Sequence, residues 1–92
     1  MIGSFKHKGL KSLFKDGVRS GVTAGQVDRI ENILSMLAVA EKLKDLDLPS
    51  LRPHPLKGEL KGFHAVTVRA NWRIVFRFVD GDCFDVDLVD YH

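Results

Sequence analysis

The sequence predicts an α+β fold, in which helices from the first half of the chain pack on a sheet from the second half. Its 92 residues are enough for one small domain and too few for two, so we expect a single domain over residues 1–92. Apolar residues recur at helical spacing in the first half and alternate with polar residues from Phe63 onward. A hydrophobic content of 45% is sufficient for a core.

The residue pattern at the N-terminus predicts a short strand followed by a short helix. Ile2 and Phe5 suggest the strand, and residues 8–16 have the spacing of a helix. The apolar positions of this helix are Leu10, Leu13 and Phe14. Gly17 fits the position just past a helix end, where a left-handed backbone is common. Residues 18–22 are expected to form a loop.

A longer helix is predicted over residues 24–42. Thr23, with Gln26 three residues later, resembles a capping box, in which both side chains satisfy backbone N–H groups of the first turn. The apolar stripe of this helix consists of Val27, Ile30, Ile33, Leu34, Leu37 and Ala38. Such a stripe is expected to face the core.

Residues 43–62 contain all three prolines of the chain, so no helix interior is expected there. His54 lies between Pro53 and Pro55. Because proline restricts both its own backbone and that of the preceding residue, His54 is held on a stiff segment. On local sequence alone, an ordinary surface histidine is the favoured interpretation.

From Phe63 onward, period-two alternation predicts antiparallel strands, with turns at Ala70–Asn71 and at 80–82. The register that aligns all apolar side chains pairs Phe78 with Phe84, Phe76 with Val86, and Ile74 with Leu88. It also places Arg77 opposite Asp85 as a cross-strand charge pair. The helices would cover the apolar face. The opposite, basic face would carry Arg69, Arg73, Arg77, Thr67 and Tyr91.

The formal net charge of +2 says little, but the charges are segregated. Basic residues lead in the first 20 residues and over 52–77, whereas acids gather over 41–47 and 80–90. A positive face favours a polyanion such as RNA, and ordinary surface charge is the simpler alternative. Cys83 is the only cysteine, which excludes an intrachain disulfide and favours a reducing cytoplasm. Neither a membrane-spanning run nor a signal peptide is apparent.

The sequence lacks the motifs of several common metal and phosphate sites. The four histidines show no metal-ligand spacing, and one cysteine cannot form a thiolate zinc site, so neither a metal nor another cofactor is expected. The acidic run from Asp80 to Asp87 lacks the ligand order of a calcium loop. Gly58 and Gly62 do not form a phosphate-binding fingerprint.

The remaining polar residues suit metal-independent cleavage of RNA. They are His54, Lys57, Arg73, Asp90, Tyr91 and His92. The 2′-hydroxyl of RNA is its own nucleophile, so a protein needs only to remove that proton, protonate the departing 5′-oxygen and stabilise charge on the phosphorane. Histidine supplies acid and base, and lysine or arginine supplies positive charge.

Three blocks of residues resemble the HigB-type toxins of the RelE/ParE superfamily, from bacterial type II toxin–antitoxin systems. They are His54-Pro55-Leu56-Lys57-Gly58, Asn71-Trp72-Arg73-Ile74 with Phe76, and Asp90-Tyr91-His92. The segment from Phe5 to Leu10 is also similar. The resemblance covers essentially the whole chain, although His64 stands where the family often has an aromatic residue.

The resemblance implies a RelE-like fold with two N-terminal helices on a mostly antiparallel, twisted sheet. It also implies an endoribonuclease that cuts mRNA in the A site of the 70S ribosome. A HigA-like helix-turn-helix antitoxin would neutralise it, and the toxin would meet operator DNA only within that complex. By matching the family motifs, the resemblance implies that the catalytic residues are His54, Lys57, Arg73, Asp90, Tyr91 and His92. Arg69 and Arg77 are expected to contact RNA phosphates generally, with Asp85 as the alternative partner of Arg77.

Some roles and rival functions stay open. His54 and His92 would transfer protons in an order that the sequence does not assign, Arg73 and Lys57 would hold the phosphate, and Asp90 would position His92. Tyr91 could stack on a base, bind phosphate or merely pack. The rivals are a ParE-like inhibitor of gyrase with the same fold and a non-catalytic module that binds RNA or protein.

Overall fold

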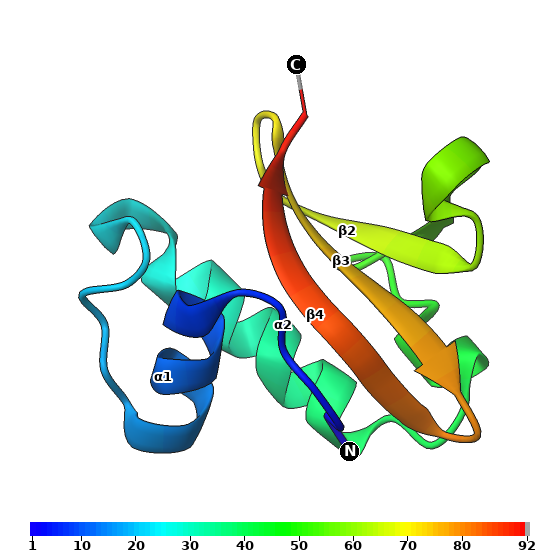
Figure 1. The fold of residues 1–92 in the computed structure, drawn as a ribbon, viewed down its shortest axis with the longest axis horizontal. Helices are drawn as coiled ribbons and strands as arrows, with labels where there is room; N and C mark the ends of the chain where they lie inside the picture. Colours follow the sequence, from blue (N-terminus) through cyan, green and yellow to red (C-terminus); the bar gives the residue numbers. More distant parts are fainter. Residues whose placement is uncertain (92) are drawn as a thin grey trace.

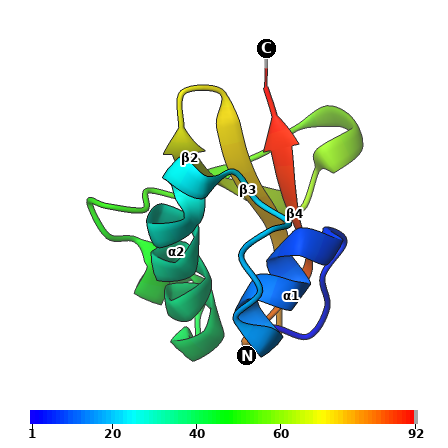
Figure 2. The ribbon, with the colours of Figure 1, turned by 90° about the vertical axis from the view of Figure 1, so that its left-hand side faces the viewer.

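The computed structural model describes residues 1–91, in which two α-helices lie on one side of an antiparallel sheet (Figures 1 and 2). The helices are α1 (Lys8–Asp16) and α2 (Val27–Val39), and the strands are β1 (His54–Pro55), β2 (Phe63–Arg69), β3 (Trp72–Val79) and β4 (Asp82–Asp90). Short 3-10 helices are η1 (Ala24–Gln26), η2 (Leu43–Leu46) and η3 (Gly58–Leu60). The predicted α+β class is confirmed.

Helix α1 has the predicted bounds and the predicted glycine stop. Gly17 adopts a left-handed backbone with φ of +68°, and its N–H donates to the Leu13 carbonyl at 3.1 Å. The start of the helix was not predicted in this detail. The His7 Nδ1 accepts a hydrogen bond from the Leu10 N–H at 3.1 Å, which satisfies one free donor of the first turn.

The predicted capping box at the start of α2 is wrong. Thr23 makes no side-chain cap hydrogen bond, and the α-helix begins only at Val27, after the 3-10 turn η1. The physical reason is the position of Gln26, which is buried. In a capping box its side-chain oxygen would accept from the Thr23 N–H, but the buried Gln26 Oε1 has no hydrogen-bond partner within residues 1–91.

Helix α2 also ends earlier than predicted, at Val39 rather than near Lys42. The Asp45 carboxylate accepts hydrogen bonds from the N–H groups of Glu41 and Lys42, at 3.0 and 3.2 Å. In a longer helix those two N–H groups would donate to carbonyls one turn earlier. The chain instead turns into η2, which buries Leu46 in the core.

The four strands pair in the order β1-β2-β3-β4, with every pairing antiparallel. Two tight turns connect the three longer strands, as predicted. Ala70 has a φ of +50° in the first turn, and Asp80 and Gly81 have φ of +49° and +86° in the second. The predicted N-terminal strand is reduced to two isolated parallel bridges with β4, at Ile2 and Phe5.

The predicted register of β3 and β4 is correct only in part. Ile74 pairs with Leu88, but a shift after Val75 pairs Arg77 with Phe84, so the predicted pairing of Phe78 with Phe84 is wrong and Phe78 pairs with Cys83. The Phe76–Val86 pair falls within the irregularity.

The cause of the shift is Asp85, which adopts a left-handed φ of +54° and adds a residue to β4. Its N–H donates to Ser4 Oγ at 2.8 Å, and its carboxylate accepts from Arg77 Nε at 2.9 Å. The predicted charge pair of Arg77 and Asp85 is therefore confirmed, although the two residues are not direct register partners.

The core lies between the helices and the face of the sheet that is turned toward them. Its fully buried side chains include Leu10, Ile30, Ile33, Leu34, Leu37, Val66, Ile74, Phe76, Cys83 and Val86. Trp72 packs against this cluster. No helix within residues 1–91 is both long and apolar enough to cross a membrane.

Candidate active site

The candidate site lies on the face of the sheet that is turned away from the helices, called here the open face. His54, Ala65, Val75 and Asp87 form one row across the four strands, because each is the register partner of the next. Partners on neighbouring antiparallel strands point to the same face. Ile74 and Phe76, which flank Val75 in β3, belong to the core. Because side chains alternate between the two faces of a strand, the row lies on the open face.

Ala65 and Val75 are buried although they lie on the open face. They are small residues between larger neighbours, and the next row along the strands contains Thr67, Arg73 and Val89. Neighbouring side chains therefore cover the middle of this face, and the exposed His54 lies at one end of its row.

Arg73 projects from β3 onto the open face and is held in place. Its Nη1 donates to the Ala70 carbonyl at 2.5 Å and to the Trp72 carbonyl at 3.2 Å. The guanidinium carbon lies 6.0 Å from the centroid of the Tyr91 ring, within the range of a cation–π interaction. Because Nη1 carries only two of the five N–H donors of the group, the Nη2 and Nε edge stays available for a phosphate.

Tyr91 is exposed and is tied to the hairpin between β2 and β3. Its N–H donates to the Asn71 carbonyl at 2.8 Å, so the chain just after β4 lies against this hairpin (Figure 1). Asp90 is also exposed, but its register partner Trp72 packs on the core, so Asp90 lies on the helix side of the sheet and not on the open face. His92 lies outside the described residues.

His54 and Lys57 are exposed at the opposite edge of the sheet. His54 is in the two-residue strand β1, and Lys57 directly precedes η3. Within residues 1–91, no hydrogen bond joins either side chain to Arg73 or Tyr91. The structure therefore brings Arg73 and Tyr91 together and places His54 on the same face, with β2 between His54 and Arg73.

The predicted basic face is narrower than the alternation of residues suggested. A shift in the register between Thr67 and Arg69 pairs Arg69 with Trp72, whose side chain packs on the core. Arg69 therefore lies on the helix side of the sheet, where its Nη1 is 3.9 Å from the position that a Cβ on Gly25 would occupy. The predicted placement of Arg69 on the open face is wrong, because alternation does not continue through a bulge.

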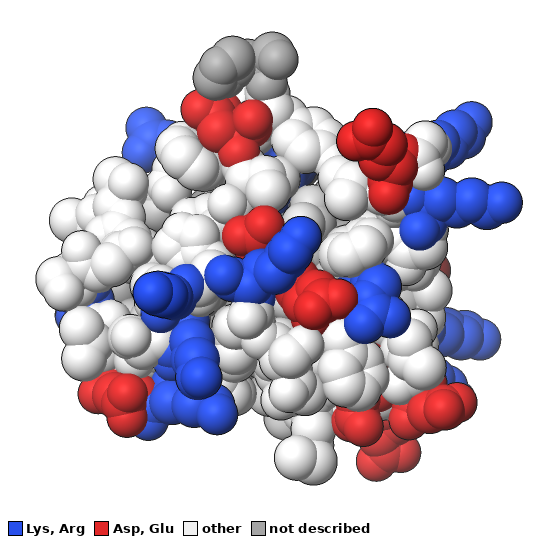
Figure 3. All heavy atoms as spheres, viewed as in Figure 1, with Lys and Arg blue, Asp and Glu red and all other residues white. Residues whose placement is uncertain are grey.

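Arg77 stays on the open face but already has a carboxylate partner. Besides the Asp85 pair, its guanidinium lies 5.8 Å from the ring centroid of Phe84. Figure 3 shows basic and acidic side chains intermixed on the side of the molecule seen in Figure 1. That side of the molecule thus combines cations with neighbouring acids, and it is not uniformly positive.

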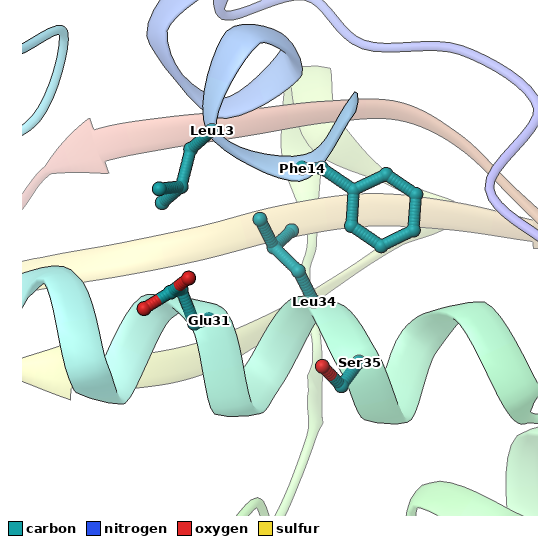
Figure 4. Close-up of a pocket in the computed structure, with 5 residues that line it drawn as sticks. All are labelled: Leu13, Phe14, Glu31, Leu34 and Ser35. Carbon is teal, nitrogen blue, oxygen red and sulfur yellow. The ribbon is translucent and has the colours of Figure 1, made fainter. Parts of the chain in front are cut away.

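Two cavities lie away from the open face. Leu13, Phe14, Glu31, Leu34 and Ser35 line one of about 150 Å³ between α1 and α2 (Figure 4). This cavity offers a single carboxylate and no histidine, so it does not suit RNA cleavage. The other, of about 440 Å³, is on the helix side of β1.

His64 lines the larger cavity together with Pro53 and Pro55, the two neighbours of His54. Burial lowers the pKa of His64, and its ring centroid lies 5.8 Å from that of Phe76. His64 therefore packs at the rim of the core, on the opposite side of the sheet from the candidate site. Among the residues that the structure describes, no three His, Cys, Asp or Glu side chains gather as metal ligands.

The sequence matches the HigB-like toxin family, the RelE-like toxins of the HigB type II toxin–antitoxin system, over residues 3–92. The chain belongs to this family. It is 50% identical to Endoribonuclease HigB of Proteus vulgaris over 92 residues, which is 100% of both chains. It is 30% identical to Toxin HigB-1 of Vibrio cholerae over 83 residues, covering 88% of this chain and 87% of the relative.

A crystal structure of a YafQ mutant from E. coli has the same fold as this HigB-family chain, with a TM-score of 0.61. The match covers 98% of this chain and 93% of YafQ. Because the identity is only 16%, the match supports the fold alone.

Sequence reasoning on this HigB-family chain missed the part played by the hairpin. Ala70 and Asn71 were predicted only as a turn, yet their carbonyl groups hold the Arg73 side chain and the Tyr91 backbone. The one available signal was the adjacency of the turn to Arg73. Which carbonyls point toward the site depends on the backbone geometry of the turn, which residue types alone do not specify.

Proposed function

We propose that this HigB-family toxin is an endoribonuclease that cuts mRNA in the A site of the ribosome. The observation that carries the proposal is Arg73, fixed on the open face by the hairpin carbonyls and the Tyr91 ring, with His54 on the same face. Family membership and the 50% identity to a relative named Endoribonuclease HigB support RNA as the substrate.

In the proposed reaction, the 2′-oxygen attacks the adjacent phosphorus and the bond from phosphorus to the 5′-oxygen breaks. One histidine accepts the proton of the 2′-hydroxyl, and the other donates a proton to the departing 5′-oxygen. His54 and His92 are the candidates for these two roles, in either order. The free donors of Arg73 would bind the oxygens of the phosphorane, where negative charge develops.

The other candidates would support this centre. Lys57, which is exposed next to β1, would contact the phosphate or a neighbouring one. Asp90 would orient His92 and favour its protonated form. Tyr91 would act through its contact with Arg73, by stacking on a base, or both.

The open arrangement of the candidate residues would account for a need for the ribosome. The candidate residues are spread over an open sheet face and do not enclose a substrate. Flexible RNA would rarely adopt the in-line geometry there, and holding reactants in the correct geometry contributes a large part of many rate enhancements. The ribosome would supply that geometry by bending the mRNA. A toxin that depends on the ribosome would act in the cytoplasm.

A type II toxin requires an antitoxin partner. We propose a HigA-like protein with a helix-turn-helix domain, with operator DNA bound only by the complex of the two proteins. The side of the toxin seen in Figure 3 mixes basic and acidic side chains and is not a strongly basic surface of the kind typical of DNA binding.

The proposed function is tested by mapping mRNA 5′ ends after the toxin is induced without antitoxin. The proposal requires new ends in phase with the reading frame, in translated messages only, and their loss in an Arg73→Ala variant. DNA damage without new RNA ends would instead indicate a gyrase inhibitor. Binding of ribosomes without cleavage would indicate a non-catalytic module.

A further inference from the structure

The segment that carries His54 has few backbone contacts of its own. Strand β1 contains only two residues and lies at the edge of the sheet. Because the Leu56 N–H faces β2, the alternate positions Pro53 and Pro55 face away from it, so only residues 54 and 56 can bond to β2 through their backbone N–H groups. The Leu56 N–H donates to the Phe63 carbonyl at 2.9 Å, and the side chain of Leu51 is buried in the core.

Arg29 of α2 makes a second connection at this edge. Its Nη2 donates to the Ser50 carbonyl at 2.6 Å and to the Thr67 carbonyl at 2.9 Å. The neighbouring residues Ile30 and Ile33 are fully buried, so α2 is a firm support for the side chain. One guanidinium nitrogen thus joins the loop that leads into β1 to strand β2.

The position of the Thr67 carbonyl explains this contact. Backbone groups of alternate residues in a strand point to the same side. Because the Phe63 carbonyl faces β1 and accepts from Leu56, the Thr67 carbonyl also points to that edge. β1 pairs with β2 only at His64 and Ala65, so Arg29 occupies the edge where β1 no longer reaches.

The backbone between Ser50 and His54 is also conformationally constrained. Arg52 has a φ of +42°, a left-handed conformation that is rare for a residue with a side chain. Such a conformation persists only where the surroundings determine it. The Arg52 N–H donates to the Leu48 carbonyl at 2.9 Å, which, with the Arg29 contact to Ser50, fixes the chain up to the strained residue, and the pairing of His54 with Ala65 fixes it beyond.

We propose that Arg29 is a positioning residue for His54, acting through the Ser50 carbonyl and the edge of β2. Loss of the guanidinium would free the loop and let β1 shift on the sheet, while the core and the Arg73–Tyr91 contact stay in place. Since a displacement of about 1 Å can cost about 100-fold in rate, the effect should fall on the chemical step and not on binding. The catalytic part of this inference rests on the proposed function, and the structural part does not.

The test compares Arg29→Met with Arg19→Met. Arg19 is an exposed arginine whose ion pair with Asp28, at 3.4 Å, is far from the His54 segment in the sequence and makes no contact with it in the described structure. Amide hydrogen exchange at Leu56 reports the docking of β1 without any reference to activity. We expect it to be at least about tenfold faster in Arg29→Met, to be unchanged in Arg19→Met, and to recover in part in Arg29→Lys. Unchanged exchange at Leu56 in Arg29→Met would overturn the proposal.

Single-turnover cleavage of ribosome-bound mRNA tests the catalytic part. We expect Arg29→Met to lower the rate about 10- to 100-fold with ribosome affinity unchanged, and to cause no further loss in a His54→Ala background. An equal loss in that background would mean that Arg29 does not act through His54, which overturns the inference. If His54→Ala alone cut normally, the proposed role of His54 would fail, whereas the exchange result would still decide whether Arg29 holds the loop.

Discussion

Replacing Arg73 should separate a catalytic cation from one that only anchors RNA. In the structure, Nη1 is used by the Ala70 and Trp72 carbonyls, and the Nη2 and Nε edge is left for the phosphate. Arg73→Ala removes a positioned donor of the kind whose loss costs about 100- to 1,000-fold in kcat, or about 3–4 kcal/mol. Arg73→Lys should recover only part of this, since one ammonium cannot hold the hairpin and also present a planar fork.

The assay is single-turnover cleavage of mRNA in 70S complexes, with ribosome affinity measured in parallel. Arg73→Ala should reduce the cleavage rate far more than the affinity. Arg77→Ala provides the contrast on the same strand, because Arg77 is paired with Asp85. It should mainly weaken binding, by an amount that fades as salt rises. Equal losses of affinity and kcat/KM in Arg73→Ala, with kcat unchanged, would refute the catalytic assignment.

Three further predictions concern stability and reactivity. Phe76→Ala should lower the free energy of unfolding by about 3–5 kcal/mol in urea titrations, because Phe76 is fully buried, and a loss below about 1 kcal/mol would contradict the packing. Burial raises the pKa of the Cys83 thiol to about 11, so thiol reagents at about pH 8 should modify Cys83 only in the denatured protein, and rapid labelling of the native protein would be inconsistent with this. Burial lowers the folded-state pKa of His64, so the unfolded chain binds the proton more tightly and stability should fall as pH drops below about 6.5. His64→Gln should flatten this part of the stability profile, and an unaltered slope would show that His64 does not contribute.

Local patterns predicted those elements whose determinants lie close together in the chain. Helix α1 is one example, because its periodicity and its glycine stop occupy ten consecutive residues. The end of α2 is a counterexample. Val39 is followed by residues with good helical character, and the competing hydrogen bonds come from Asp45, whose effect depends on how the chain folds back.

The register of β3 and β4 failed for a similar reason. The bulge at Asp85 is stabilised by Ser4, 81 residues away in the sequence. The alternation of apolar and polar residues cannot reveal such a long-range contact. A second irregularity, near Thr67, moves Arg69 to the helix side of the sheet. Period-two patterns therefore placed residues correctly only between bulges.

The candidate site was predicted by residue type but not by geometry. The motifs and the alternation of strands placed His54 and Arg73 in the set, and both lie on the open face. The contacts that give Arg73 its position come from backbone carbonyls of the hairpin and from the Tyr91 ring. Arg29 was absent from the sequence prediction, since its role depends on two carbonyl groups from distant segments.

The central claim is that RNA supplies the nucleophile and that side chains of the open face only move protons and stabilise charge. The most direct measurement is the chemistry of the product ends from ribosome-bound mRNA, with and without a 2′-deoxy nucleotide at the cleaved position. The account predicts a 2′,3′-cyclic phosphate or 3′-phosphate on the upstream product, a 5′-hydroxyl on the downstream product, and no cleavage of the 2′-deoxy message. Products with a 3′-hydroxyl and a 5′-phosphate, or normal cleavage of the 2′-deoxy message, would contradict it.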